Sequence, residues 1–294
     1  MLIPTIILGI YPNVILETLH VSTTQLLYTV SPLPSVSDLN ISVFSLLPIV
    51  AIKYPQTNCK EIVVWGNNLS LTVGYPLYNK VIRSMIDLPH YQFSVVIGIL
   101  LSDGWSVLSQ SRSLNLENSK RNASLCFKQS FDKFDYFMEV FNILSHYCAK
   151  LPTLIKGKRN NTITYALNFC TRALPCFTKI HSLFYVQNSL EDRIGTKVIP
   201  KNIYHWLDSI ALAHWIMGDG YKHGKGLILS TDSFSIEDVV LLTNVLIIRY
   251  DLDCNIRTNS SGYNRIYIRV NSMDKLRSIV LPHMIPSMLY KINM

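Results

Sequence analysis

The sequence predicts an α+β protein made of two similar units in tandem, and three observations support this fold class. An apolar run that ends in a small residue, Asp, Gly and an aromatic residue occurs twice, at residues 96–105 and 212–221. After each copy, an extended segment is followed by apolar residues at helical spacing. In each half, a further extended segment and a last helix follow. The same order of elements in both halves indicates an internal repeat.

The elements of the first half follow from residue spacing. We expect an apolar helix up to about residue 101, a strand at 124–128 and a helix that begins near Phe134. In that helix, large apolar side chains recur every three or four residues. Alternating apolar and polar residues at 163–169 predict a further strand.

The second half has the same order with clearer boundaries. The run 226–230 predicts a strand, and Ser235 is typical of the N-cap of the next helix. Five residues of this helix share one face at helical spacing, namely Ile236, Val240, Thr243, Ile247 and Tyr250. Residues 265–270 alternate between a basic or aromatic face and an aliphatic face, which predicts a strand with one side in water.

These elements divide the 294 residues into four parts. Residues 58–186 form the first unit with its lead-in, 187–202 form a polar linker, and 203–294 form the second unit. Residues 1–57 form an N-terminal extension that we leave unassigned and expect to be poorly ordered. Its apolar stretches contain prolines and are shorter than the about 20 residues of a membrane span. We therefore expect no transmembrane helix and no membrane partner.

Composition favours a polyanionic partner and a reduced interior. Lys and Arg number 27 against 19 Asp and Glu, which gives a formal charge of +8. This excess favours a nucleic acid or an anionic surface. The six cysteines form no CxxC pair and have no histidine at zinc-ligand spacing. We expect them to be reduced and mostly buried.

Asp103 and Asp219, which follow the two apolar runs, are the candidate catalytic and metal-binding residues. A carboxylate is unfavourable at the C-terminal end of a helix, where the macrodipole is negative, unless a cation is bound there. The glycine after each Asp suits the left-handed position that ends many helices. A single Asp-Gly pair is usually only a turn, but two copies in matching contexts favour a metal site.

If the two apolar helices pack side by side and parallel, both carboxylates converge. Small residues at 98, 102, 211 and 218 permit a close approach of the helices. Two converging carboxylates repel each other unless a metal ion neutralises them. Oxygen ligands indicate a magnesium-like ion. His214, which occupies the place of Gly98 in the second copy, is expected to be a packed or capping histidine.

Residues 96–104 and 212–220 resemble the nonapeptide that names the LAGLIDADG family of homing endonucleases. Residues 59–66, 73–76 and 285–291 are similar to fungal mitochondrial intron-encoded members, so the resemblance covers about residues 58–294. It implies an αββαββα unit repeated as a pseudo-dimer within a monomer. The pseudo-two-fold saddle formed by its two sheets would lie in the major groove of double-stranded DNA.

The resemblance also implies a site. Asp103 and Asp219, helped by the backbone carbonyls of Ser102 and Gly218, would bind Mg²⁺, or Mn²⁺, or Ca²⁺ in a non-cleaving state. Gln129, Lys225 and Arg269 are candidates for the auxiliary residues that order water. The candidate DNA-binding residues are Arg112, Lys120, Arg121, Lys128, Lys222, Lys225, Arg257, Arg265, Tyr267 and Arg269.

Three functions remain open from the sequence. The first is a site-specific DNA endonuclease that hydrolyses both strands of a long pseudo-palindromic site, located in the mitochondrion by family resemblance. The second is a maturase that binds its own intron RNA and assists splicing, with or without DNA cleavage. The third is an inactive DNA-binding remnant that the apolar extension attaches to a membrane. Survival of both motif aspartates favours the nuclease.

Overall fold

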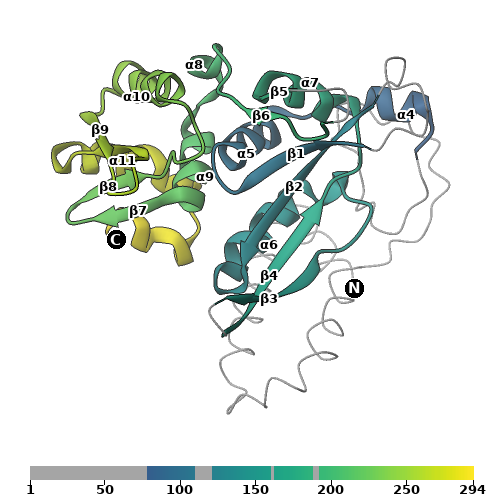
Figure 1. The fold of residues 1–294 in the computed structure, drawn as a ribbon, viewed down its shortest axis with the longest axis horizontal. Helices are drawn as coiled ribbons and strands as arrows, with labels where there is room; N and C mark the ends of the chain where they lie inside the picture. Colours follow the sequence, from purple (N-terminus) through teal and green to yellow (C-terminus); the bar gives the residue numbers. More distant parts are fainter. Residues whose placement is uncertain (1–77, 110–120, 160–161, 188–191) are drawn as a thin grey trace, which may run out of the picture. The chain divides into compact units, whose positions relative to one another are not determined.

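The structure, a computed structural model, describes residues 78–109, 121–159, 162–187 and 192–294 (Figure 1). All of these residues belong to one compact unit, residues 62–294. The predicted extension 1–57 and the similar segments at 59–66 and 73–76 lie outside the described residues. Within the described residues, none of the helices has the length and apolar character needed to cross a bilayer.

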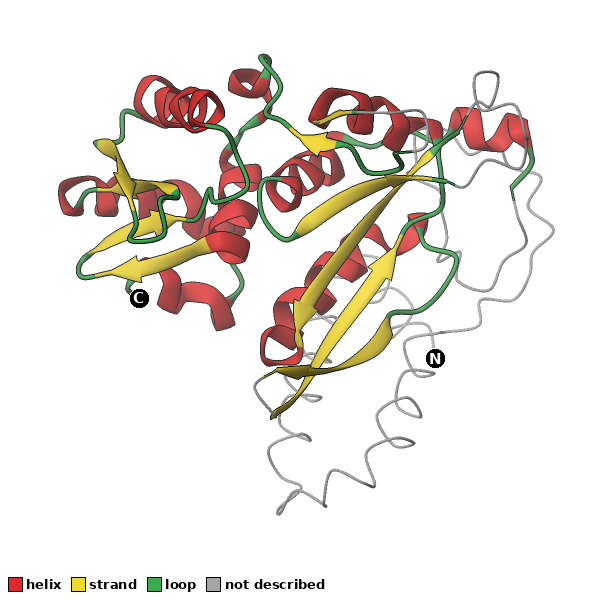
Figure 2. Cartoon of the chain, in the orientation of Figure 1, coloured by secondary structure: helices red, strands yellow, loops and turns green. Residues whose placement is uncertain are grey.

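The described chain contains the order αββαββα twice (Figure 2). The first unit consists of α5 (His90–Leu100), β1 (Gly104–Leu108), β2 (Ala123–Ser130), α6 (Phe134–Leu144), β3 (Thr153–Arg159), β4 (Thr162–Cys170) and α7 (Pro175–Phe184). The second consists of α9 (Ser209–Asp219), β7 (Gly220–His223), β8 (Gly226–Leu229), α10 (Ile236–Tyr250), β9 (Cys254–Thr258), β10 (Asn264–Ile268) and α11 (Met273–Val280).

Short elements precede, connect and follow the two units. They are α4 (Lys80–Met85), β5 (Tyr185–Val186), β6 (Thr196–Lys197), α8 (Ile203–Trp206) and the C-terminal 3-10 helix η7 (Pro286–Ile292). The predicted linker, 187–202, therefore includes β6, which pairs with β5 of the first unit.

Each unit contains one antiparallel four-stranded sheet with the same strand order. The orders are β1-β2-β4-β3 and β7-β8-β10-β9. Gly104 opposes Phe127 in the first sheet, and Gly220 opposes Leu229 in the second, so the two registers can be superposed residue by residue. The predicted α+β class and the tandem αββαββα arrangement are confirmed.

Helix α10 begins as predicted but does not bury the predicted face. Ser235 is its N-cap and accepts a hydrogen bond from the Asp238 backbone N–H, and Asp251 ends the helix in a left-handed conformation. Ile236, Val240 and Ile247 are exposed, however. The core face instead consists of Val239, Leu242, Thr243, Val245 and Leu246. Both faces are apolar, so spacing alone could not identify the buried one. The strand predicted at 265–270 ends at Ile268, and Val270 is exposed.

Helices α5 and α9 form the centre of the protein and pack directly against each other (Figure 1). Residues 94–100 of α5 and 211–218 of α9 are all buried, because these helices are surrounded on every side. The Ser94 hydroxyl donates to Asp208 at the start of α9, Gly98 lies against Ala211 and His214, and Gly218 lies against Ser102. The contacts advance in the same direction along both helices, so the pair is parallel, which is the arrangement that lets both motif aspartates converge.

Glycine is required at positions 104 and 220, but for a different reason from the one predicted. Neither glycine has a positive φ, and the C-cap Gly220 is extended with φ −73°. A Cβ at Gly104 would lie 2.8 Å from the Ile99 carbonyl oxygen, and one at Gly220 would lie 2.6 Å from the Ile216 carbonyl oxygen. The chain turns back so tightly against the last helical turn that no side chain fits.

The expectation that all cysteines are reduced is wrong for one pair. Cys126 and Cys170 oppose each other on β2 and β4 and form a disulfide. Sequence spacing gave no sign of it, because the two residues are 44 positions apart and meet only when the strands pair. Cys148 and Cys176 are free and buried, as expected, and Cys254 is free and half-buried.

Gly98→Ala is expected to lower the free energy of unfolding by about 1–3 kcal/mol, the usual range for overpacking. The new Cβ would lie 2.5 Å from the Ala211 carbonyl oxygen and 2.6 Å from His214 Cβ, and neither belongs to a flexible side-chain end. Urea unfolding measures the effect. As a control, Gly157→Ala on exposed β3 should change stability by less than about 1 kcal/mol. Equal stability of the two variants would contradict the close helix contact.

Candidate metal centre and nucleic-acid interface

Asp103 and Asp219 meet where the two central helices end. Asp219 is the last residue of α9, and Asp103 lies between the end of α5 and β1. A Cβ placed on Gly218 would lie 3.3 Å from Asp103 Oδ2, so the Asp103 carboxylate lies against the end of α9. Burial, and then the charge of Asp103, raises the pKa of Asp219 to about 7. The two carboxyl groups therefore lie in one poorly solvated site.

A lysine binds carbonyls at the C-terminal end of each central helix, and of the two, Lys291 is buried and Lys197 is half-buried. Lys291 Nζ donates to the carbonyls of Met217 at 2.5 Å and Gly218 at 2.7 Å. Lys197 Nζ donates to the carbonyls of Leu100 at 2.8 Å and Gly104 at 2.9 Å. The Leu100, Met217 and Gly218 carbonyls lie in the last turn of a helix and have no partner within it, whereas Gly104 begins β1. An ammonium also offsets the negative end of the helix dipole. Each lysine lies just after the αββαββα unit whose helix it binds.

Burial brings the pKa values of these two lysines close to neutral pH. It lowers the pKa of Lys291 to about 7, with Lys133 as a second cause, although Asp103 and Asp219 act in the opposite direction. Burial likewise lowers the pKa of Lys197 to about 8 against the pull of both aspartates. The centre thus combines two acids with amines that can hold or release a proton near pH 7.

The two halves of the centre are not equivalent. In the first half, Gln129 Nε2 donates to Asp103 Oδ2. The superposed register gives Thr231 the corresponding position in the second half, and its hydroxyl instead donates to the Asn264 carbonyl at 2.6 Å. Lys133, which follows β2, reaches across to the Gly218 carbonyl at 3.4 Å. The Asp219 side therefore receives a second lysine from the other half of the chain.

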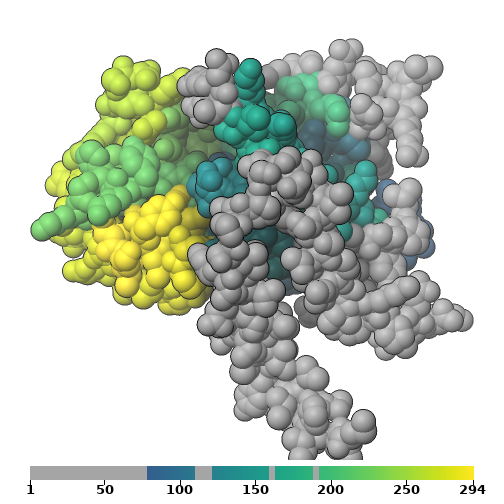
Figure 3. All heavy atoms as spheres, turned by 90° about the horizontal axis from the view of Figure 1, so that it is seen from below, coloured from purple at the N-terminus to yellow at the C-terminus, as the bar shows by residue number. Residues whose placement is uncertain are grey.

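A cavity of about 780 Å³ lies on the Asp219 side. It is lined by Lys133, Gly218, Asp219, Gly220, Tyr221, Lys222, Ser230, Tyr290, Lys291, Asn293 and Met294. Figure 3 shows the yellow C-terminal residues beside the green surface of the β7–β8 region. Three lysines and one carboxylate make this cavity suitable for an anionic group next to an acid.

The donor set fits a hard divalent cation held mainly by the two carboxylates. Asp103 and Asp219 supply only oxygen, which suits Mg²⁺ rather than a softer metal. No third His, Cys, Asp or Glu joins them among the residues that the structure describes. The Gly218 carbonyl, a predicted ligand, already accepts from Lys291 and Lys133, so it is a poorer ligand than the sequence suggested. Water and substrate oxygens would complete the coordination.

Two predicted auxiliary residues lie elsewhere. Lys225 is exposed in the turn between β7 and β8. Arg269 follows β10 and pairs with Asp253 at 3.3 Å on the surface. Of the three candidates, only Gln129 contacts a motif aspartate. Sequence reasoning missed Lys133, Lys197 and Lys291, because a lysine in a polar segment resembles a surface residue until the fold brings it to the centre.

The candidate DNA-binding residues divide between the two faces of each sheet. We call the open face of a sheet the side that faces away from the helix packed on it, which is α6 for the first sheet and α10 for the second. Lys128 projects from the open face of the first sheet, and Arg257, Arg265 and Tyr267 project from that of the second. Lys222 opposes the buried Leu227, so it faces the cavity and not the open face. Arg121 lies two residues before β2, and Arg112 and Lys120 lie outside the described residues.

Comparison with known proteins identifies the class to which this fold and centre belong. The sequence profile of the LAGLIDADG DNA endonuclease family matches residues 93–276, which is more than half of the chain. The chain therefore belongs to the LAGLIDADG DNA endonuclease family. The match spans both central helices and both sheets.

Individual relatives include proteins named for RNA and for DNA functions. Cytochrome b mRNA maturase bI2 of Saccharomyces cerevisiae is 33% identical over 207 residues, which are 68% of this chain and 47% of that protein. The chain thus spans about half the length of this relative. Intron-encoded endonuclease ai4 of Dictyostelium discoideum is 32% identical over 161 residues, 53% of this chain and 97% of that protein.

A solved structure, that of the homing endonuclease I-WcaI bound to its DNA recognition sequence, has a similar fold. The TM-score is 0.61 at 25% sequence identity, with 74% of this chain and 95% of that chain covered.

His214 is expected to make stability depend on pH in the acidic range. It is buried at the α5–α9 contact, where the Tyr136 hydroxyl donates to its backbone carbonyl at 3.0 Å. Burial lowers its pKa from 6.5 to about 3, with His283 as a second cause. Between these pH values the unfolded state binds a proton that the folded state does not. The His214 contribution to the free energy of unfolding therefore falls as pH drops from 6.5 towards 3.

Chemical unfolding of the wild type and of His214→Gln across this range measures the effect. The wild type should lose up to about 1.4 kcal/mol per pH unit relative to the variant. His205→Gln, at an exposed histidine, serves as the control and should follow the wild type. Parallel pH profiles for the wild type and His214→Gln would show that His214 is accessible to protons in the folded state.

Proposed function

We propose that this chain is a metal-dependent endonuclease that cuts both strands of a specific double-stranded DNA site. The observation that carries the proposal is the meeting of Asp103 and Asp219 at the ends of two parallel helices, between two sheets of the same topology. Membership of the LAGLIDADG DNA endonuclease family and the similarity to DNA-bound I-WcaI support it. We further propose that the chain acts as a monomer with two pseudo-symmetric halves, in the mitochondrion.

The proposed chemistry uses the residues of the centre in separate roles. Asp103 and Asp219 would hold Mg²⁺, which supplies activation of water and charge neutralisation at the phosphate. Lys133 and Lys291 line the cavity on the Asp219 side and would attract the non-bridging phosphate oxygens. Gln129 orients the Asp103 carboxylate through its amide. Lys197 and Lys291 keep the ends of the central helices in place.

The open faces of the two sheets would hold the DNA. Together the described candidates on these faces are basic or aromatic, and the chain carries a formal charge of +8. Lysine and arginine contacts to phosphates release counterions, so binding should weaken steeply as salt increases. Antiparallel sheets of this width present alternate side chains to one side, which suits contact with successive base pairs in a major groove.

Asp103→Asn and Asp219→Asn should each abolish Mg²⁺-dependent cleavage while DNA binding is retained. Each change removes a charged metal ligand but keeps the shape of the side chain. The measurement is cleavage of the intron-less form of the host gene by the full chain, with binding followed in parallel by gel shift. Asp274→Asn, which changes an exposed acid of α11, is the matched control for cleavage. Retained cleavage in either motif variant would contradict the proposed roles.

Lys133→Met should slow cleavage of one strand more than the other, because Lys133 serves only the Asp219 side. Nicked plasmid would then accumulate before linear product in a time course on supercoiled DNA. Lys128→Met removes the same charge from an open face and should weaken binding without a change in the nicked fraction. The idea fails if the two variants give the same ratio of nicked to linear DNA.

A maturase function is the second candidate, and the observation that favours it is the 33% identity to a cytochrome b mRNA maturase. The fold and both aspartates are compatible with an RNA-binding role that needs no cleavage. Splicing assays with the host intron RNA distinguish the two. Tight binding to that RNA by folded protein, together with no cleavage of the intron-less DNA, would establish the maturase in place of the nuclease.

A further inference from the structure

We propose that Arg257 recognises a guanine in one half of the DNA site, and that Arg265, which opposes it on the next strand, does not contact a base. This inference rests on the proposed DNA-binding function and names the residue that gives the second half its base preference. It is carried by the different surroundings of two arginines that project from the same open face.

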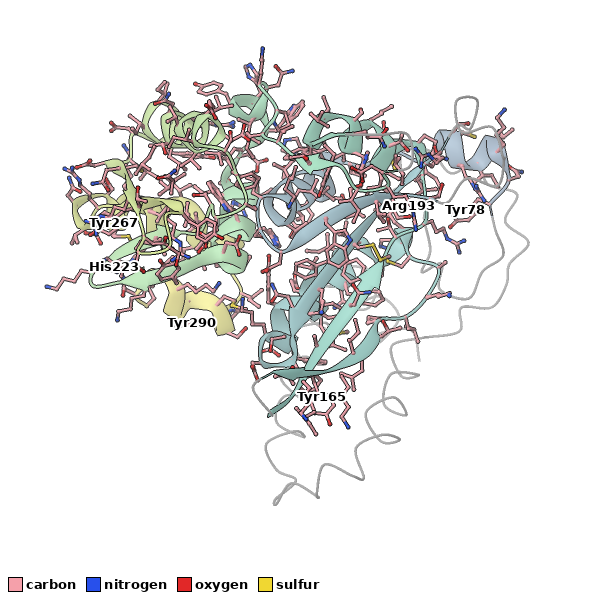
Figure 4. All side chains as sticks on the ribbon, in the orientation of Figure 1. Tyr78, Tyr165, Arg193, His223, Tyr267 and Tyr290 are labelled. Carbon is pink, nitrogen blue, oxygen red and sulfur yellow. A yellow bond between two sulfur atoms is a disulfide. The ribbon has the colours of Figure 1, made fainter. Side chains whose placement is uncertain are left out.

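The guanidinium of Arg257 lies over an aromatic ring, and the residue is exposed. Its Cζ lies 3.6 Å from the centre of the Tyr267 ring, so the two planar groups stack. Its other interaction is with His223, at 3.3 Å from Nη1 to Nε2. His223 in turn packs edge-on against Tyr267 (Figure 4). Arg257 is also exposed, so an aromatic surface positions in advance a side chain that solvent still reaches.

All three nitrogens of the Arg265 guanidinium already donate a hydrogen bond within the protein. Its Nε and Nη2 donate to the two carboxylate oxygens of Asp232 at 2.7 and 2.5 Å, and Nη1 donates to the Tyr221 hydroxyl at 3.0 Å. A guanidinium in a bidentate pair must break that pair before it can bind a base edge. Arg265 therefore acts as a support that fixes Tyr221 and Asp232.

The first half of the chain lacks this arrangement at the corresponding positions. Phe169 and Ile266 occupy matching places, because each opposes the strand residue that faces the motif glycine. One residue earlier, Asn168 matches Arg265, and their cross-strand partners are Thr153 and Arg257. Thr153 has no planar cation, and Cys170, bound to Cys126, replaces the Tyr267 ring. The base preference should therefore appear in only one half of a pseudo-palindromic site.

Guanine is the base that fits a positioned arginine. In the major groove, guanine presents O6 and N7 as two acceptors side by side, and the arginine fork matches their spacing. Adenine and thymine each place only one acceptor on that edge, and cytosine presents a donor. Stacking on Tyr267 restricts Arg257 to one plane, so less rotamer freedom is lost on binding. The fixed plane also prevents the fork from turning to suit another base.

The test is selection of binding sites from a randomised DNA library by the full 294-residue chain without divalent metal. The wild type should select a G·C pair at one position whose pseudo-symmetric counterpart shows no such preference. Arg257→Lys keeps the charge but loses the fork, and should reduce the preference for that pair about tenfold or more. The rest of the profile should be unchanged. Tyr267→Phe should keep the preference, and Tyr267→Leu should lose it.

Arg265→Lys is the matched control, and it should retain the G·C preference even if overall affinity falls. A selection profile that is unchanged by Arg257→Lys would overturn the proposal. So would Arg257→Ala if it weakens binding equally for all sequences and lowers the salt slope by about 1, as loss of a phosphate contact does. Failure of the wild type to select any sequence would instead overturn the proposed function itself.

Discussion

The contact between α5 and α9 determines the rest of the structure. Gly98 and Gly218 have no side chain, so each backbone packs directly on the partner helix, against Ala211 and His214 at one level and Ser102 at the other. Because the two helices are parallel, their C-terminal ends meet at one point. The sheets begin at Gly104 and Gly220, so the same helix ends also fix the positions of the sheets. A change at this contact therefore affects stability, the position of the acids and the relation of the two sheets together.

The charges of the centre follow from that packing. Two carboxylates at the negative ends of two helices would repel each other and the unpaired carbonyls around them. Lys197 and Lys291 each donate to carbonyls at the end of one helix, and Lys133 donates on the Asp219 side alone. The three amines offset part of the negative charge but leave the carboxylates as oxygen donors. The unequal placement of Lys133 and Gln129 makes a pseudo-symmetric fold chemically asymmetric.

Much of the fold and of the candidate site was predictable from the sequence, because the repeat shows the same pattern in both halves. The motif aspartates, the central helices, the Ser235 N-cap and two strands of the second sheet, β8 and β10, follow from local pattern. The features that were not predicted depend on contacts between segments that are distant in the sequence. The disulfide needs β2 and β4 to pair, the buried lysines need the unit ends to fold back, and the inward face of α10 depends on the sheet beneath it. Gly104 and Gly220 were recognised as necessary, but close packing rather than a left-handed conformation explains them.

The central claim is that Asp103 and Asp219 share one divalent cation. Thermal unfolding of the full chain with and without millimolar Mg²⁺ tests it without any need for the DNA target, since an ion that binds only the folded state raises the melting temperature. The wild type should be stabilised by Mg²⁺. Asp103→Asn and Asp219→Asn should each be more stable than the wild type without metal, because repulsion is relieved, and should lose the Mg²⁺ effect. An undiminished Mg²⁺ shift in either variant would contradict a shared site.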